Sequence, residues 1–233
     1  MIIPKSLRAV IFDLDGTLVD SSGEIAVALE RTFRERGLPP LSRQRVETLI
    51  GRGVVVLVER ALAEVGAGTG DTAAVVERFE AHYAQTVGTA AVLFPGVAEG
   101  MQRFRAAGWP MAVVTNKPRY FTEHLLERLG VRGLLAAIVA GDDGIRRKPH
   151  GDMLIAACKA MDVLPERTLM LGDSDNDIIA ARAAGCPVWC VPYGYNEGKP
   201  PEQLNCDRLV ASIDEAAKLL TSAAGSGFPS PRE

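Results

Sequence analysis

The sequence predicts an α/β fold: a doubly wound parallel sheet with a small helical domain inserted into it. Two observations predict this class. Along most of the 233 residues, short apolar runs of strand length alternate with helical periods, which is typical of a parallel sheet covered by helices. Residues 21–93 break that alternation with helical periods and no convincing strand. That interruption indicates an inserted helical domain.

Five apolar runs are predicted to be buried parallel strands. The first, residues 8–14 (RAVIFDL), is nearly continuous in apolar side chains, as expected for a strand covered on both faces. The other predicted strands are residues 111–115, 136–140, 169–171 and 188–191.

Helical periods separate these strands. Residues 96–107 follow Pro95 and end near Gly108, which are good start and stop signals for a helix. The other helices predicted in the sheet domain are residues 119–129, 152–161 and 177–184.

The inserted segment is predicted to hold four helices. Residues 24–36 place their apolar side chains on one helical face. Within the segment, residues 54–58 (VVVLV) are also compatible with a strand, but their continuation into ERALAEV favours a helix. The remaining predicted helices are residues 43–50, 54–65 and 72–87. Residues 1–20 and 94–221 are thus predicted to form the sheet domain, residues 21–93 the insert, and residues 222–233, rich in Gly, Ser and Pro, a disordered tail.

Composition excludes several classes of protein. The formal net charge of −3 gives no basic face for nucleic acid, and the first apolar stretch is too short to span a membrane. No secretion signal is recognised at the N-terminus. Four cysteines in a chain of this size are expected to be ordinary thiols, not a disulfide framework. We therefore expect a cytoplasmic protein that binds neither nucleic acid nor a membrane.

Two carboxylates follow the first predicted strand. Asp13 and Asp15 are one residue apart, and on an extended chain they point to the same side. Close carboxylates repel each other and burial adds to the cost, but a hard divalent cation such as Mg²⁺ relieves both. Gly16 allows the backbone to turn sharply after them. The alternative is an Asp-rich turn that only closes the strand.

Two further segments offer groups suited to a phosphate. Thr115 and Asn116 follow the second strand of the sheet domain, and a hydroxyl followed by free backbone N–H groups suits phosphate oxygens. Alternatively, Thr115 only caps the following helix.

Lys148 could neutralise the phosphate and the charge that develops in the reaction. A plain surface lysine is the alternative, and Arg147 is a rival for the same role.

The fourth apolar run ends in the acidic segment GDSDND, residues 172–177. Gly172 permits a close approach of the backbone to a neighbour. Because the carboxyl ends of parallel strands meet at one edge of the sheet, Asp173 is placed to complete a metal site with Asp13 and Asp15. Asp177 is expected to orient the lysine. An Asx-turn that caps the next helix is the alternative.

Taken together, these segments resemble the haloacid dehalogenase superfamily of phosphotransferases. DLDGT at residues 13–17, Thr115, Lys148 and GDSDND at residues 172–177 match its four motifs, and the helical insert resembles its smaller helical cap. Within the superfamily the chain most resembles the bacterial phosphoglycolate phosphatases. The stretches that carry this closer resemblance are residues 49–62, 94–101, 113–118, 172–187 and 191–198.

The resemblance implies a Mg²⁺-dependent phosphatase. It implies that Asp13 attacks phosphorus and becomes aspartyl-phosphate, and that Asp15 acts as general acid and then general base. It also implies that Mg²⁺ is held by the side chains of Asp13 and Asp173 and by the backbone carbonyl of Asp15.

The same resemblance implies roles in substrate binding. Thr115, Asn116 and Lys148 would hold the phosphoryl oxygens, and the cap would close over the site to exclude water. In the cap, Arg52 lies in a Gly-Arg-Gly turn and is the candidate to pair with a substrate carboxylate. An arginine exposed to solvent is the alternative.

The expected substrate is a small phosphate ester, 2-phosphoglycolate first. The alternatives are a sugar phosphomutase of the β-phosphoglucomutase type, a phosphatase for another sugar phosphate or for pyrophosphate, and a receiver-like protein in which Asp13 only accepts a phosphoryl group. Dehalogenation is disfavoured, because the dehalogenase branch lacks the aspartate found here at Asp15. A monomer and a homodimer are both compatible with the sequence.

Overall fold

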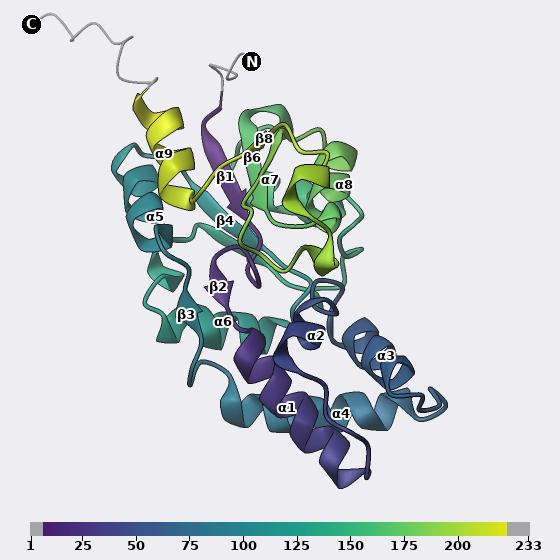
Figure 1. The fold of residues 1–233 in the computed structure, drawn as a ribbon. Coiled ribbons are helices and arrows are strands. Elements are labelled where there is room, and N and C mark those ends of the chain that lie inside the picture. Colours follow the sequence, from purple (N-terminus) through teal and green to yellow (C-terminus); the bar gives the residue numbers. More distant parts are fainter. Residues whose placement is uncertain (1–6, 223–233) are drawn as a thin grey trace, which may run out of the picture.

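Residues 7–222 are described by the structure, a computed structural model (Figure 1). They form a six-stranded sheet in which every neighbouring pair is parallel. In spatial order the strands are β5 (Ala137–Val139), β4 (Met111–Val114), β1 (Ala9–Phe12), β6 (Thr168–Gly172), β7 (Val188–Cys190) and β8 (Arg208–Leu209). The predicted fold class and the five predicted strands are confirmed, whereas β8 was not predicted.

Successive side chains of the central strand β1 pack into two different hydrophobic cores. Val10 and Phe12 pack in the core on one face of the sheet, and Ala9 and Ile11 pack in the core on the other. All four side chains are fully buried. This alternation is what a strand covered on both faces requires, and it explains why the strand appears in the sequence as a continuous apolar run.

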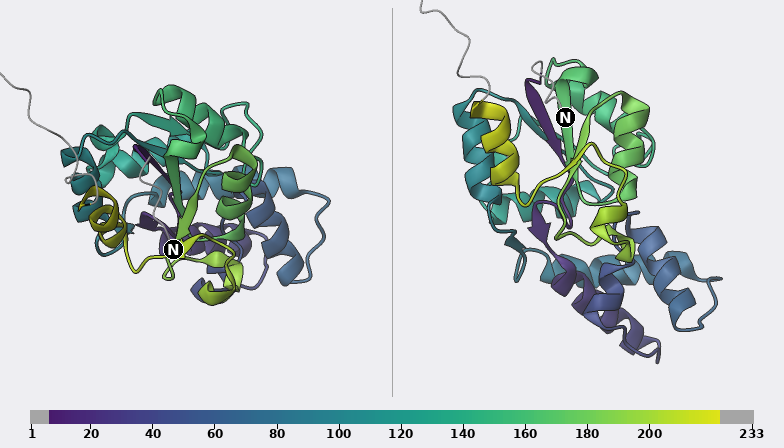
Figure 2. Two further views of the ribbon diagram at one scale, coloured as in Figure 1. Left: turned by 90° about the horizontal axis from the view of Figure 1, so that it is seen from above. Right: turned by 45° about the horizontal axis from the view of Figure 1, so that its top comes forward.

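Helices cover both faces of the sheet (Figure 2). On one face, α5 (Val97–Ala106) packs against α9 (Ile213–Ser222), and α6 (Arg119–Arg128) adds its buried side to the same core. On the other face, α7 (Asp152–Ala160) packs against α8 (Asp175–Ala184). Helix α8 begins two residues before the predicted start, and α9 was not predicted.

The inserted segment is helical, as expected. It holds α1 (Ser22–Glu35), α2 (Arg43–Glu47), α3 (Val54–Glu64) and α4 (Thr72–Thr86). Figure 1 shows these helices gathered beyond the carboxyl edge of the sheet. Residues 54–58 are helical, so the strand alternative is wrong. Helix α2 is three residues shorter than predicted.

A short antiparallel ribbon joins the insert to the sheet domain. Strand β2 (Val19–Asp20) leads into the insert and β3 (Val92–Leu93) leads out of it. Next to this ribbon, the buried carboxylate of Glu24 accepts hydrogen bonds from the backbone N–H groups of Gly88, Ala90 and Ala91. These bonds fasten the returning chain to α1. Neither strand of the ribbon was predicted.

Two further predictions concern the chain as a whole. The four cysteines are free thiols, as predicted. Within residues 7–222, none of the helices has the length and apolar character needed to cross a membrane. The predicted disordered tail falls on residues 223–233, outside the described part, apart from Ser222, which ends α9.

Candidate active site

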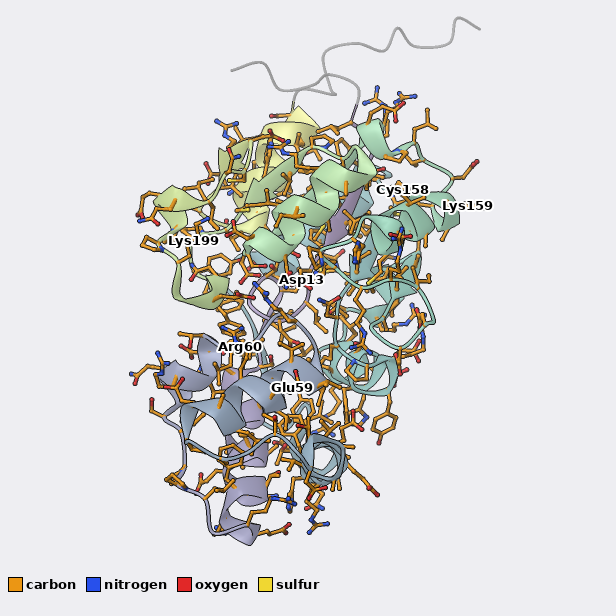
Figure 3. All side chains as sticks on the ribbon, turned by 90° about the vertical axis from the view of Figure 1, so that its right-hand side faces the viewer. Asp13, Glu59, Arg60, Cys158, Lys159 and Lys199 are labelled. Carbon is orange, nitrogen blue, oxygen red and sulfur yellow. The ribbon has the colours of Figure 1, made fainter. Side chains whose placement is uncertain are left out.

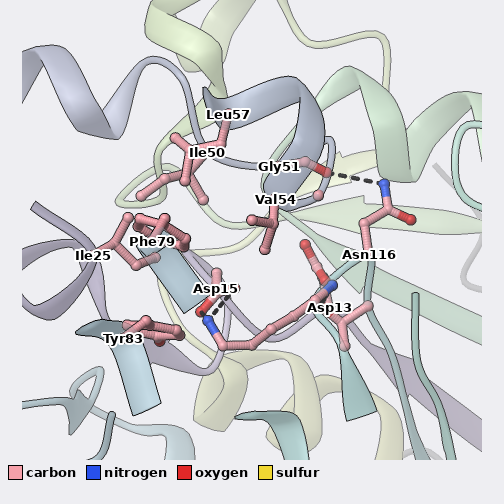
Figure 4. Close-up of a pocket in the computed structure, with 13 residues that line it drawn as sticks. Asp13, Asp15, Ile25, Ile50, Gly51, Val54, Leu57, Phe79, Tyr83 and Asn116 are labelled. Atoms are coloured by element: carbon pink, nitrogen blue, oxygen red, sulfur yellow. Dashed lines mark hydrogen bonds and ion pairs between the residues drawn. The ribbon is translucent and has the colours of Figure 1, made fainter. Parts of the chain in front are cut away.

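A pocket lies between the insert and the carboxyl edge of the sheet (Figure 4). Its cavity volume is about 40 Å³. The insert supplies most of its apolar wall, and the sheet domain supplies polar groups from the loops that follow β1 and β4. The apolar lining residues are Ile25, Ile50, Val54, Leu57 and Phe79, and the polar ones are Asp13, Asp15, Tyr83, Thr115, Asn116 and Lys117. In Figure 3, Asp13 lies between the insert, marked by Glu59 and Arg60, and the sheet domain, marked by Cys158.

Asp13 lies at the centre of an acidic cluster. It directly follows β1 and is 7% exposed. One carboxylate oxygen each of Asp13, Asp173 and Asp177 lies within 4.8 Å of the others. The Nζ atom of Lys148 lies 2.8 Å from Asp13 Oδ1. The cluster therefore holds three buried carboxylates, two of which, those of Asp13 and Asp177, pair with one ammonium group.

Asp177 holds Lys148 in place, as predicted. Its Oδ1 is 2.7 Å from Lys148 Nζ, and its Oδ2 accepts hydrogen bonds from the hydroxyl and backbone N–H of Ser174 and from the backbone N–H of Asp173. Ser174 is the N-cap of α8, and the two residues form a capping box. The acidic segment therefore also caps the next helix, which was the alternative role. The capping box fixes the position of the Asp177 carboxylate that orients Lys148.

Two glycines allow these carboxylates to approach the backbone. Gly16 has φ +88°, and a Cβ atom there would lie 2.6 Å from Asp173 Oδ2. A Cβ atom on Gly172 would lie 2.5 Å from the side chain of Asp177. Any larger residue at either position would displace an acidic side chain of the cluster. The positive φ of Gly16 fits the sharp turn expected there, and Gly172 makes the close approach expected for it.

Burial, together with the neighbouring carboxylates, raises the pKa values of Asp13 and Asp173 in the cluster. Burial raises the pKa of Asp13 to about 8 against the opposing charge of Lys148. Burial, followed by the charge of Asp177, raises the pKa of Asp173 to about 7. A divalent cation would balance the uncompensated charge, and buried carboxylate oxygens are the ligands that Mg²⁺ prefers. The donor set therefore fits a divalent metal ion.

The side chain of Asp15 turns away from this cluster. Its two oxygens lie 3.0 and 2.9 Å from Lys117 Nζ, and Oδ1 also accepts a hydrogen bond from the hydroxyl of Ser21. Asp15 lines the pocket beside Asp13. Its carboxylate is therefore directed away from the acidic cluster, and only its backbone carbonyl is left for the metal role expected from the sequence.

Sequence reasoning missed Lys117 and Tyr83. Lys117 is 6% exposed, and its ammonium lies 4.8 Å from the centroid of the Tyr83 ring. Burial disfavours the charged form, but the charge of Asp15 outweighs it and raises the pKa of Lys117. Burial also raises the pKa of Tyr83 to about 12, so its hydroxyl is neutral. The position of Lys117, two residues after Thr115 at a strand end, was the available signal.

The loop after β4 places Thr115 and Asn116 in the pocket. Thr115 is 2% exposed, and its hydroxyl oxygen accepts a hydrogen bond from the backbone N–H of Lys117 at 3.3 Å. The N-cap of α6 is Pro118, so the alternative that Thr115 caps this helix is wrong. The side-chain amide of Asn116 donates to the carbonyls of Gly51 at 3.0 Å and Lys148 at 2.9 Å. Its side-chain donors thus bind protein, and its backbone N–H is the donor left for a phosphoryl oxygen.

Arg52 does not reach the pocket. Its guanidinium donates to both carboxylate oxygens of Glu197, at 2.6 and 2.9 Å, and its side chain is 52% exposed. The insert and the sheet domain are thereby joined at the surface, and the expected contact with a substrate carboxylate does not match this arrangement. Arg147, the rival of Lys148, is exposed and donates to the carbonyl of Gly141, whereas Lys148 is buried beside Asp13.

Comparison with known proteins agrees with this site. The family model described as haloacid dehalogenase-like hydrolase matches residues 7–185. The chain is 42% identical over 223 residues to a phosphoglycolate phosphatase of Thiobacillus denitrificans, covering 94% of this chain and 98% of the relative. It is 43% identical over 219 residues to the phosphoglycolate phosphatase of Pectobacterium atrosepticum, covering 92% of each.

A solved structure shares the complete fold. The crystal structure of a predicted phosphoglycolate phosphatase from Haemophilus somnus aligns with a TM-score of 0.87 at 31% identity, covering 92% of this chain and 98% of the other. The match includes the insert as well as the sheet domain, and the family match covers the strand ends that carry the acidic cluster. This chain therefore belongs to the haloacid dehalogenase-like hydrolases.

Proposed function

We propose that this phosphoric monoester hydrolase is a Mg²⁺-dependent phosphatase that hydrolyses 2-phosphoglycolate through an aspartyl-phosphate on Asp13. The observation that carries the proposal is the convergence of Asp13, Asp173 and Lys148 at one edge of the sheet, with Asp15 lining the same pocket. These groups suit nucleophilic attack, proton transfer and stabilisation of charge. The names of the relatives support the choice of substrate.

In the first step, a carboxylate oxygen of Asp13 forms a bond to phosphorus while the bond from phosphorus to the glycolate oxygen breaks. Lys148, 2.8 Å from Asp13, stabilises the negative charge on the transferring group. The hydroxyl of Thr115 and the backbone N–H of Asn116 are proposed to donate to phosphoryl oxygens. Positioning and charge stabilisation account for most of the catalysis in phosphoryl transfer.

Asp15 is proposed to move the protons. In its acid form it donates a proton to the leaving glycolate oxygen, so that glycolate departs and aspartyl-phosphate remains on Asp13. The resulting carboxylate of Asp15 then takes a proton from water, whose oxygen attacks phosphorus. The bond between phosphorus and Asp13 breaks, and inorganic phosphate is released.

The side chains of Asp13 and Asp173 and the backbone carbonyl of Asp15 are proposed to hold Mg²⁺. When bound, the ion offsets the repulsion between the nucleophile and the phosphate dianion. Asp177 lies in the same cluster. The carboxylate of Asp177 is paired with the ammonium of Lys148 and also fastened to Ser174, whereas Asp173 accepts only from the neutral donors of Thr17, Tyr195 and Asn196, so we assign Asp177 to support rather than to ligation.

The apolar side chains that line the pocket favour a small leaving group over a sugar. The insert covers the pocket with the aliphatic and aromatic side chains of Ile50, Leu57 and Phe79, which offer no hydrogen bonds to the hydroxyls of a sugar ring. Buried hydroxyls without partners cost binding free energy. This argues against a sugar phosphomutase or a sugar phosphatase. The enzyme is proposed to act in the cytoplasm, as a monomer or a homodimer.

The test is release of inorganic phosphate from a panel of phosphate esters by the purified protein, with Mg²⁺ and with excess chelator. We expect turnover of 2-phosphoglycolate with Mg²⁺ only. The variant Asp13→Asn should lose at least about 10³-fold in kcat, because an amide is a poor nucleophile, while its circular dichroism spectrum stays unchanged. Intact-mass analysis of rapidly quenched wild-type enzyme should detect a phosphorylated species that Asp13→Asn lacks. Full turnover under chelation, or by Asp13→Asn, would refute the proposal.

A further inference from the structure

One buried cation in the pocket has no task in the reaction proposed above. Lys117 lines the pocket and is 6% exposed, and its ammonium contacts only Asp15 and the face of Tyr83 among the interactions of the described chain. The other buried ammonium nearby, on Lys148, is already held between Asp13 and Asp177. Burying a lysine is costly unless it is paired. Within the described residues the ammonium of Lys117 pairs with the carboxylate of Asp15 alone, so it is available to an anionic group of the substrate.

A second polar group beside Lys117 lacks an acceptor. The hydroxyl of Tyr83 is buried near the ammonium of Lys117, which can only donate to it, and within residues 7–222 its own O–H has no acceptor. Its ring is fixed by aromatic contacts, with centroids 5.7 Å from Phe79 and 4.8 Å from Phe121. Buried hydroxyls nearly always have a partner in native proteins. A pocket residue with an unsatisfied donor therefore indicates a ligand group that completes it.

The position of these two groups limits which part of a substrate they can meet. Asp15 must contact the ester oxygen to protonate it, and Lys117 Nζ lies 2.9 Å from Asp15 Oδ2. A group attached one carbon beyond the ester oxygen would therefore lie next to Lys117 and Tyr83. The other side chains of the cap wall are apolar, so none of them offers a charged partner to an anion at this position.

We propose that Lys117 and Tyr83 form the subsite that recognises the carboxylate of the leaving group, and that Lys117 is a specificity-determining residue of the enzyme. This inference rests on the proposed function and deepens it. The sequence had assigned recognition of the carboxylate to Arg52, whose guanidinium is instead paired with Glu197 at the surface.

The same arrangement links recognition to catalysis. In the structure, Lys117 binds both oxygens of Asp15. When the substrate carboxylate arrives, it takes over the ammonium of Lys117 and the hydroxyl of Tyr83. The carboxyl group of Asp15 is then free to turn toward the ester oxygen. An ester without an anionic leaving group leaves Asp15 bound to Lys117 and reacts more slowly.

The experiment compares two esters that differ in this group only. Wild-type enzyme, Lys117→Met and Tyr83→Phe are assayed with Mg²⁺ on 2-phosphoglycolate and on ethyl phosphate, which carries a methyl group in place of the carboxylate. The measured quantity is the selectivity, the ratio of the two kcat/KM values. We expect Lys117→Met to lower the selectivity roughly 10- to 100-fold and Tyr83→Phe to lower it about 2- to 10-fold.

The control is Lys159→Met, which removes an exposed lysine from α7 and should leave the selectivity unchanged. If Lys117→Met lowers kcat/KM equally for both esters, Lys117 serves Asp15 alone and the subsite does not exist. If wild-type enzyme hydrolyses both esters with equal kcat/KM, this inference fails while the phosphatase proposal stands. If neither ester is hydrolysed, the proposed function itself fails.

Product inhibition distinguishes recognition of the carboxylate from a purely structural role of Lys117. A purely structural role would not change the inhibition constant of glycolate selectively. Glycolate carries the carboxylate, and inorganic phosphate does not. In Lys117→Met we expect the inhibition constant of glycolate to rise roughly 10-fold or more, while that of inorganic phosphate stays within about twofold. A parallel rise of both constants would indicate a damaged pocket and would overturn the assignment.

Discussion

At the scale of single residues, the ammonium of Lys148 is shared by two buried carboxylates, and Asp177 is the one that holds it in place. Replacing Asp177 with asparagine exchanges a charged acceptor for a neutral amide, whose N–H group would face the donors of Ser174. We expect Asp177→Asn to lower the free energy of unfolding by about 2 kcal/mol. We also expect kcat to fall roughly 10- to 100-fold, because Lys148 loses its orientation.

The matched control for that variant lies on the same helix. Asp175 pairs with Lys199 at the surface, where their side chains are 46% and 32% exposed. Exposed ion pairs contribute at most about 1 kcal/mol, so Asp175→Asn should stay close to wild type in urea unfolding and in kcat. Equal effects of the two substitutions would contradict the role given to Asp177.

Single residues also differ in how far the sequence could predict them. Asp13 and Asp173 could be predicted because the ends of parallel strands must meet at one edge of the sheet, whereas Lys148 lies in a loop well after β5 and its role was implied by the resemblance to the superfamily motifs. Lys117 and Tyr83 could not be paired in advance, since Tyr83 comes from the inserted helices and its position over the site is set by packing between domains. Arg52 was misjudged for the same reason, because its partner Glu197 comes from a distant loop.

At the scale of elements, the loop before α3 is attached to the sheet domain by two kinds of contact. The carbonyl of Gly51 accepts hydrogen bonds from the side chains of Asn116 and Asn176, each at 3.0 Å, and Arg52 pairs with Glu197. Asn176 is 5% exposed, so Asn176→Ala removes a partly buried hydrogen bond between the insert and the sheet domain. We expect KM for 2-phosphoglycolate to rise about 2- to 10-fold.

Arg52→Ala is the companion variant. Because the ion pair of Arg52 is half exposed, its loss should raise KM less than fivefold, and less than Asn176→Ala does. Both variants are measured with saturating Mg²⁺. An increase well above 10-fold for Arg52→Ala would revive the direct contact with the substrate carboxylate that the sequence suggested.

Helices and strands could be predicted where their buried side chains leave a recognisable pattern of apolar residues in the sequence. The strands at the centre of the sheet are buried on both faces and therefore appear as continuous apolar runs. Strands β2, β3 and β8 have two residues each, which is too short for any period. Helix α9 did carry a signal, since its buried residues Ile213, Ala216, Ala217 and Leu220 follow helical spacing, and it could have been predicted.

At the scale of the whole molecule, the acidic cluster couples folding to pH and to metal. Asp13 and Asp173 have pKa values of about 8 and about 7 in the folded chain, against 3.8 for an unperturbed aspartate. A carboxyl group whose pKa is raised on folding binds more protons in the folded state than in the unfolded one. Without metal, its stabilising contribution is therefore complete below about pH 4 and is lost as the pH rises to about 8.

A divalent cation should reverse this loss, because it binds the ionised carboxylates that destabilise the metal-free protein. We expect Mg²⁺ to raise Tm by more at pH 8 than at pH 6, with a difference of at least about 2 °C for a chain of this size. The variant Asp173→Asn removes one of the repelling charges. Without Mg²⁺ at pH 8 it should therefore melt at a higher temperature than wild type, and Mg²⁺ should change its Tm little. Calorimetry of both proteins at the two pH values checks these expectations. A stabilisation by Mg²⁺ that does not depend on pH, or that persists in Asp173→Asn, would show that the ion binds elsewhere.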